Sequence, residues 1–158
     1  MTVQTAKQVI ACLEKFNAHF RTLERFISEK KAKVIADDLA WLLDSLVEEQ
    51  RLVAEGNNLE TRRLKLFEEL GIADKKATAL IEECPEEYRS RLRLECASLE
   101  RHIDFIKQAN ADIIEIIERK LTIQEKMSNA PVTSVNTYTG KGVKVRQQSG
   151  AGGIIGEV

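Results

Sequence analysis

The chain has 158 residues, of which 31% are charged and only 5% aromatic, and its formal net charge is −1. This length suits one modest domain, and the composition favours long helices with charged outer faces over a β-sandwich. No apolar run is long enough to cross a bilayer, and the first residues lack the apolar stretch of a signal peptide. We therefore expect a cytoplasmic protein without membrane insertion.

The charge is unevenly distributed along the chain. Residues 128–158 contain three basic side chains and one acidic side chain, which gives +2. The remaining 21 basic and 24 acidic side chains give residues 1–127 a charge of −3. A nucleic-acid-binding protein usually has a concentrated basic patch with aromatic residues among it, and this sequence has none. The pattern argues against nucleic acid as a partner.

Residues 3–30 carry the clearest helical pattern. Apolar side chains recur at alternating spacings of four and three residues, which places them on one face of a helix in a heptad seam. The seam consists of Ala6, Val9, Leu13, Phe16, Phe20, Leu23 and Ile27. This pattern predicts a bundle helix.

A second long helix is predicted over residues 33–70. Its apolar pattern runs through Ile35, Leu39, Leu42, Leu46 and Val53, and recovers after Gly56 through Leu59, Arg63, Leu66, Phe67 and Leu70. Residues 30–37 could form a turn or continue the first helix. Gly56-Asn57-Asn58 is a poor helical segment, since a glycine inside a helix costs about 1 kcal/mol relative to alanine. This segment either weakens one helix or separates two. Gly71 is suited to the position just after a helix C-terminus.

A short helix is predicted near residues 74–83, and a last long helix over residues 86–127, which would be roughly 60 Å long. The seam of the last helix is Leu92, Cys96, Leu99, Ile103, Ile106, Asn110, Ile113 and Ile117. Asn110 is interpreted as a buried polar residue that fixes helix register, or alternatively as a polar anchor for a partner helix. Ile114, Ile116 and Leu121 lie off the seam. The surplus apolar face must be exposed or meet a partner.

The composition changes after Met127. Six of the eight glycines lie between Gly140 and Gly156, and helical periodicity ends. The sequence therefore predicts an all-α fold: an antiparallel bundle of three long helices plus a short helix in residues 1–127, followed by a flexible, disordered glycine-rich tail in residues 128–158.

No catalytic or metal-binding pattern is found. Cys12, Cys84 and Cys96 have no metal-type spacing, and Cys96 lies on an apolar stripe, as a buried thiol would. His19 and His102 are the only histidines. A signalling bundle could use His102, but no residues that would cradle a phosphoryl group surround it. We expect a binding protein with no enzymatic activity, no cofactor and no metal.

Three features together resemble the FlgN family. They are the segment Arg62-Arg63-Leu-Lys-Leu-Phe-Glu-Glu-Leu-Gly-Ile, the asparagine before paired aliphatics at Asn110, Ile113 and Ile114, and the tail segment Asn136-Thr-Tyr-Thr-Gly-Lys-Gly142. FlgN-like proteins commonly carry a Tyr-Gly-x-x-Gly-like motif in the tail. Tyr138 and Gly142 match this motif, whereas Thr139 stands where the first glycine often is.

The resemblance implies a cytosolic chaperone of flagellar type III export. Such chaperones bind the C-terminal amphipathic helices of the hook–filament junction (hook-associated) proteins and deliver them to the cytosolic domain of the export gate. By position, the client-binding residues would be Ile106, Asn110, Ile113, Ile114, Ile117 and Leu121. The gate-docking residue would be Tyr138. A structural homodimeric coiled coil, in which the surplus apolar face meets its own copy, is the alternative.

Overall fold

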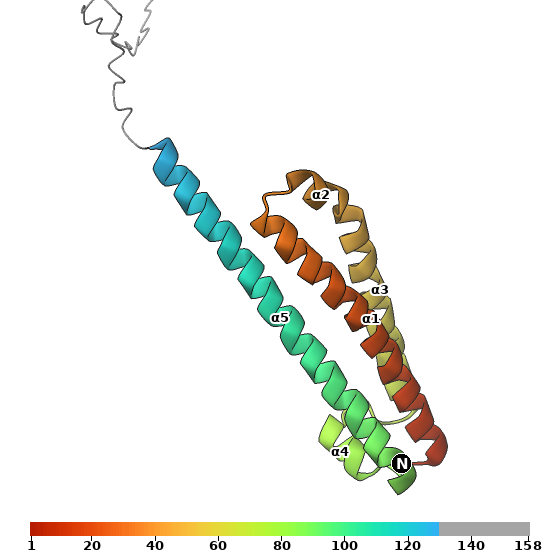
Figure 1. Cartoon of the computed structure of the whole chain (residues 1–158). Coiled ribbons are helices and arrows are strands. Elements are labelled where there is room, and N and C mark those ends of the chain that lie inside the picture. Colours follow the sequence, from red (N-terminus) through yellow and green to blue (C-terminus); the bar gives the residue numbers. More distant parts are fainter. Residues whose placement is uncertain (130–158) are drawn as a thin grey trace, which may run out of the picture. The chain divides into compact units, whose positions relative to one another are not determined.

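The computed structural model describes residues 1–129, and the predictions made for the tail beyond them lie outside this range. The described residues form five helices and no strand, so the all-α prediction is confirmed for this part of the chain (Figure 1). The helices are α1 (Val3–Ile35), α2 (Leu39–Asp44), α3 (Leu46–Glu69), α4 (Ala77–Glu82) and α5 (Glu86–Ser128). The packing described below lies within the compact unit Met1–Thr122.

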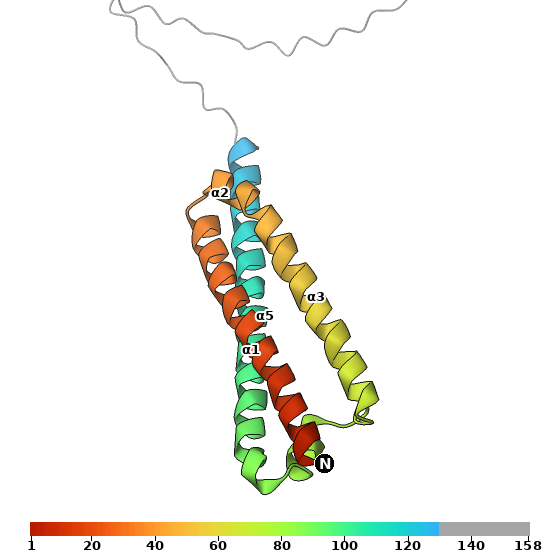
Figure 2. The same cartoon turned by 90° about the vertical axis from the view of Figure 1, so that its right-hand side faces the viewer.

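Long helices that follow one another in the chain run antiparallel, as predicted, so α1 and α5 run in the same direction (Figures 1 and 2). Contacts between α1 and α5 advance together: Asn17 pairs with Glu95, and seven residues later Glu24 pairs with His102. Contacts between α1 and α3 run in opposite directions, since Lys30 pairs with Glu49 and His19 lies beside Glu55.

A tight turn separates α1 from α2 and settles the alternatives left open for residues 30–37. Asp37 adopts a left-handed conformation with φ of 57°, which ends α1. Asp38 then caps α2, because its carboxylate accepts a hydrogen bond of 3.1 Å from the backbone N–H of Trp41. The predicted second helix over residues 33–70 was therefore wrong in its first part, since α1 extends to Ile35 and α3 begins only at Leu46.

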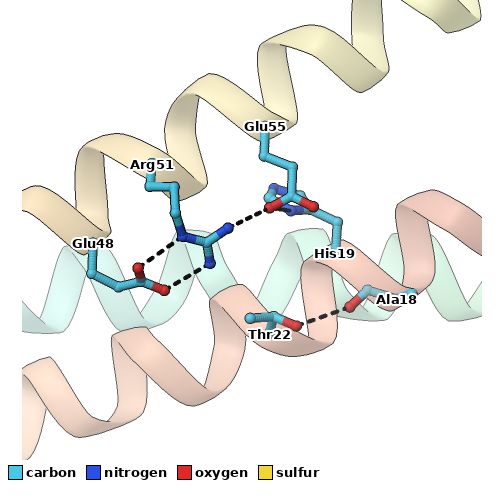
Figure 3. A network of polar contacts seen from close by, with 6 residues as sticks. All are labelled: Ala18, His19, Thr22, Glu48, Arg51 and Glu55. Atoms are coloured by element: carbon cyan, nitrogen blue, oxygen red, sulfur yellow. Dashed lines mark hydrogen bonds and ion pairs between the residues drawn. The ribbon is translucent and has the colours of Figure 1, made fainter.

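Helix α3 passes through Gly56 without a break, and a close contact with α1 explains the glycine. A Cβ atom at Gly56 would lie 3.1 Å from Nε2 of His19, whose side chain is buried. Beside this contact, Arg51 bonds both Glu48 and Glu55, and Glu55 lies 3.8 Å from Nδ1 of His19 (Figure 3). The glycine thus lets the His19 imidazole pack directly on the α3 backbone.

The end of α3 follows the sequence prediction. Gly71 has φ of 65°, and its N–H donates to the carbonyl of Glu68 while the N–H of Ile72 donates to that of Phe67. This hydrogen-bond pattern terminates a helix at a glycine in the C′ position. The short helix α4 begins at Ala77 rather than near Asp74, and α5 begins at Glu86 as predicted.

Two separate groups of buried side chains hold the helices together. Cluster 1 joins the first half of α1 to the end of α3, to α4 and to the start of α5, and cluster 2 joins the second half of α1 to the middle of α5. Cluster 1 contains Ala6, Val9, Ile10, Leu13, Phe67, Ile72, Leu80, Cys84 and Leu92. Cluster 2 contains Ile27, Val34, Ala109 and Ile113.

The predicted seam of the second helix was wrong before Gly56 and correct at its end, where Phe67 is buried and Leu66 and Leu70 pack against cluster 1. In the first part of this seam, Leu42 is partly buried against cluster 2. The other four side chains are 49–65% exposed: Ile35, Leu39, Leu46 and Val53. Leu52, one residue before Val53, is 1% exposed instead. The corner at Ser45 between α2 and α3 explains the shift, because a helix that restarts there no longer continues the stripe of the helix before it.

Replacing Leu52 by alanine should therefore lower the free energy of unfolding by about 2–5 kcal/mol, through lost burial and a residual cavity. The neighbouring change Val53→Ala removes an exposed side chain and should alter stability by no more than about 0.5 kcal/mol. Urea denaturation of both variants measures the difference. Equal destabilisation by the two changes would contradict the packing of α3 described here.

The contact between Gly56 and His19 predicts that changes at the two positions are coupled. Gly56→Ala should be less favourable in the wild-type protein than in a His19→Ala background, by at least about 0.5 kcal/mol. In the second background the clash is gone, so the helix gains up to about 1 kcal/mol from the better helix former. A double-mutant cycle by urea denaturation measures this coupling, and additive effects would contradict the close approach.

Candidate functional site

The six residues predicted to bind a client divide into two groups on α5. Ile113 is 5% exposed in cluster 2, and Ile106 packs partly buried against the same cluster. The other four are exposed and follow one another at spacings of four, three and four residues, so they form a single line along the helix. We call Asn110, Ile114, Ile117 and Leu121 the α5 stripe.

The α5 stripe presents substantial apolar surface. Ile114 is 56% exposed, Ile117 41% and Leu121 55%. Isolated exposed aliphatic residues are common on proteins, but three in line on one helix form a contiguous apolar strip. Glu118 lies beside the strip and is exposed, so the strip has a polar border. This arrangement suits an amphipathic partner.

The predicted core position of Asn110 was wrong, because its side chain is exposed and Ala109 is buried in its place. Likewise Ile116, rather than Ile117, packs against cluster 2. From Ile106 onward the buried or partly buried positions recur at spacings of three, four and three residues, at Ile106, Ala109, Ile113 and Ile116, instead of the predicted four, three and four. The packing partners of α5 change before this point: in cluster 1 it meets α1, α3 and α4, whereas in cluster 2 it meets α1 and Leu42 of α2.

A buried asparagine does link two helices, but it is Asn17 on α1. Asn17 is 2% exposed, and its Nδ2 donates to the backbone carbonyl of Glu95 at 3.1 Å and to the Glu95 carboxylate at 2.7 Å. The apolar pattern does not reveal this residue, because Asn17 follows seam residue Phe16 directly and lies off the seam. Its position seven residues before Glu24, which also bonds α5, is the signal that could have revealed it.

His102 lies partly buried between α5 and α1. Its Nδ1 lies 2.7 Å from the carboxylate of Glu24, and its Nε2 lies 3.4 Å from the hydroxyl of Ser98. Both ring nitrogens therefore have partners on α1 and α5. This arrangement gives His102 a role in holding the two helices in register.

Two ionic contacts hold the stripe-bearing part of α5 against α1. Lys31 bonds Asp112, and hydrogen bonds from Lys31 and then from Gln108 lower the pKa of the Asp112 carboxyl group. Lys120 donates to the backbone carbonyl of Ile35 at 3.0 Å and to Asp37 at 2.5 Å. These contacts, together with cluster 2, hold the neighbouring face of α5 against α1 and leave the α5 stripe exposed.

A second exposed apolar surface lies on α2 and the first half of α3, and it was not predicted as a surface. Its residues are 49–76% exposed: Leu39, Leu43, Leu46, Val47 and Val53. The heptad spacing of three of them was visible in the sequence and was assigned to the core. Periodicity alone cannot distinguish an apolar stripe that meets the bundle from one that faces solvent.

The described residues show no arrangement suited to metal chemistry. Cys12, Cys84 and Cys96 are all free, and within residues 1–129 no three metal-ligating side chains gather at one point. Burial raises the pKa of all three thiols, which keeps them protonated at neutral pH. Tyr138, the predicted gate-docking residue, lies outside the described residues.

No helix in residues 1–129 combines the length and the apolar character needed to cross a lipid bilayer. Searches among curated proteins and among solved structures find nothing similar to this chain. The profile of the family described as FlgN protein, in contrast, matches residues 1–146, which is most of the sequence and includes every described helix. The chain therefore belongs to the FlgN family, a family of flagellar export chaperones.

Proposed function

We propose that this protein is a cytoplasmic chaperone that binds the C-terminal amphipathic helices of hook–filament junction proteins on the α5 stripe and delivers them to the export gate. Family membership supports an export chaperone in general. The observation that carries the choice of surface is the exposed line Ile114, Ile117 and Leu121 on α5.

The spacing of the α5 stripe fits a helical client. An amphipathic helix recognises a partner through apolar anchors at spacings of three and four residues, which the stripe reproduces. Burying the exposed part of each of three aliphatic side chains would contribute about 1 kcal/mol apiece. A contribution of this size supports a reversible complex, as a chaperone that must release its client requires.

The α5 stripe is also held in place before a client arrives. Ile113 and Ile116 anchor the neighbouring face of α5 in cluster 2, and Lys31 bonds Asp112 on the same helical turn. A surface that is already ordered loses less conformational entropy when it binds. The support behind the stripe therefore favours binding without refolding of α5.

Ile114→Asp should weaken binding of a junction-protein C-terminal helix by more than tenfold, or about 1.4 kcal/mol, because it places a charge in the apolar contact. Leu94→Asp is the matched control, since Leu94 is 69% exposed on the same helix but lies off the stripe. Titration calorimetry with the client helix should give wild-type affinity for the control. Equal affinities for both variants would place the client elsewhere.

The same variants separate a chaperone from a homodimeric scaffold. A chaperone should sediment at the same rate at all concentrations when its client is absent. A dimer that dissociates on dilution, and that Ile114→Asp converts to a monomer, would instead favour the scaffold, in which the α5 stripe meets its own copy.

The tail of residues 128–158 is proposed to act as a tether that carries Tyr138 to the export gate. An aromatic ring buries a large area and has few rotatable bonds, so a single tyrosine is an efficient anchor in a short motif. Tyr138 is the only aromatic residue after Phe105, and therefore the only one in the tail.

Tyr138→Ala should weaken binding to the cytosolic domain of the gate and slow client export. Because the tail is proposed to be separate from the bundle, melting temperature and client affinity should stay at wild-type values. Tyr138→Phe retains the ring area and should keep most of the gate affinity. Export at the wild-type rate by Tyr138→Ala would remove the tail from this mechanism.

A further inference from the structure

A groove lies between the first half of α1 and the second half of α3, and the proposed function does not use it. Its volume is about 250 Å³ and it is open to solvent. Most of its lining is apolar: Ala11, Cys12 and Phe16 come from α1, and Leu59 and Leu66 from α3. We call this hollow the α1–α3 groove.

Positive charge borders this apolar lining. Lys15 and Arg62 both line the groove and are exposed, and neither forms an ion pair with any side chain of residues 1–129. The nearby acids are already engaged: Glu60 accepts two hydrogen bonds from Arg63, and Glu14 bonds Arg91 on α5. Two cations on the border of the groove are therefore free to bind an external carboxylate.

Cys12 behaves as part of the apolar lining rather than as a reactive group. Burial raises the pKa of its thiol, and the opposing effects of Arg63 and Lys15 are smaller. A protonated thiol is a small, weakly polar side chain and a poor nucleophile. The groove is thus an apolar trough with a cationic border.

We propose that the α1–α3 groove docks a helix of a partner protein that carries one or two large apolar side chains beside a carboxylate. The apolar side chains would enter the trough, and the carboxylate would lie between Lys15 and Arg62. The volume is smaller than the 300–1,000 Å³ typical of small-molecule sites and suits one or two anchoring side chains. Charge complementarity selects an acidic amphipathic helix over a basic one.

This site is distinct from the α5 stripe. The contacts of α1 with α5 place the level of Cys12 about 20 helical residues before the level of the stripe, which corresponds to about 30 Å along α1. A partner in the groove would leave the stripe free. The chaperone would therefore bind an acidic helix and a client helix at the same time, and the proposal does not depend on the identity of the client.

Two designed 18-residue helical peptides test the proposal on the full chain. Both carry leucines at spacings of three and four residues, with flanking glutamates in one peptide and lysines at the same positions in the other. The acidic peptide should bind at least about tenfold more tightly by fluorescence anisotropy. At alkaline pH, where part of the thiol is ionised, the acidic peptide should also protect Cys12 from iodoacetamide, read by mass spectrometry, while the labelling of Cys96 stays unchanged.

The double variant Lys15→Glu/Arg62→Glu should reverse this preference, and Lys15→Gln/Arg62→Gln should abolish it. Arg21→Glu/Arg93→Glu is the matched control, because it makes the same change in net charge at exposed positions outside the groove. The control should keep the wild-type preference. Melting temperatures identify any variant that fails to fold. If the glutamate variant does not fold, the loss of preference in Lys15→Gln/Arg62→Gln is the deciding measurement.

Several results would overturn the proposal. Equal affinity for the two peptides, or binding without protection of Cys12, would show that the groove is not the site. Loss of binding in Ile114→Asp would move the peptide to the α5 stripe. If the wild-type chain dimerises and Lys15→Glu/Arg62→Glu makes it monomeric, the occupant is a second copy instead of a partner helix.

Discussion

The amide of Asn17 lies buried between α1 and α5 and donates hydrogen bonds to both the backbone carbonyl and the carboxylate of Glu95. A buried amide left without partners costs about 1–3 kcal/mol, so this pairing favours one register of α5 over its neighbours. A shift of one residue would turn α5 by about 100° and carry Ile114 to another face. Which side chains of α5 face solvent thus depends on a contact far from them.

The contact of Glu24 with His102 repeats this constraint one heptad later, and Lys31 with Asp112 continues it. These polar pairs also fix the register of α5 against α1. Apolar side chains alone would pack nearly as well in a shifted register, because leucine and isoleucine contacts are non-directional. The polar pairs supply the specificity, while clusters 1 and 2 supply most of the burial.

The sequence was sufficient for the helices that hold one buried face throughout their length. The seam of α1 was predicted correctly at Ala6, Val9, Leu13, Phe16 and Ile27, all of which are buried. Prediction from the sequence failed where the packing of one helix on another decides which side chains are buried. The corner at Ser45 buried Leu52 instead of Val53, and the change of packing partners along α5 buried Ala109 instead of Asn110. Gly56 was recognised as unusual in a helix. Its cause is the His19 ring that packs against it, and this contact is visible only once the helices are packed.

For the candidate site, the sequence located the surplus apolar face on α5, and the structure divided it into buried Ile113 and exposed Ile114.

The unequal size of the two clusters gives the molecule a gradient of local stability. Nine buried residues tie the ends of α1, α3, α4 and α5 together in cluster 1, whereas four tie α1 to α5 in cluster 2. Opening a region costs free energy in proportion to the apolar contacts it breaks, so helices separate more readily around Val34 and Ala109 than around Val9 and Leu92. The α5 stripe lies at this loosely held end. Transient separation of the helices there would expose Ile113 beside Ile114 without unfolding α5. Under the proposed function, this wider apolar surface would let one chaperone adjust to clients whose side chains differ in size.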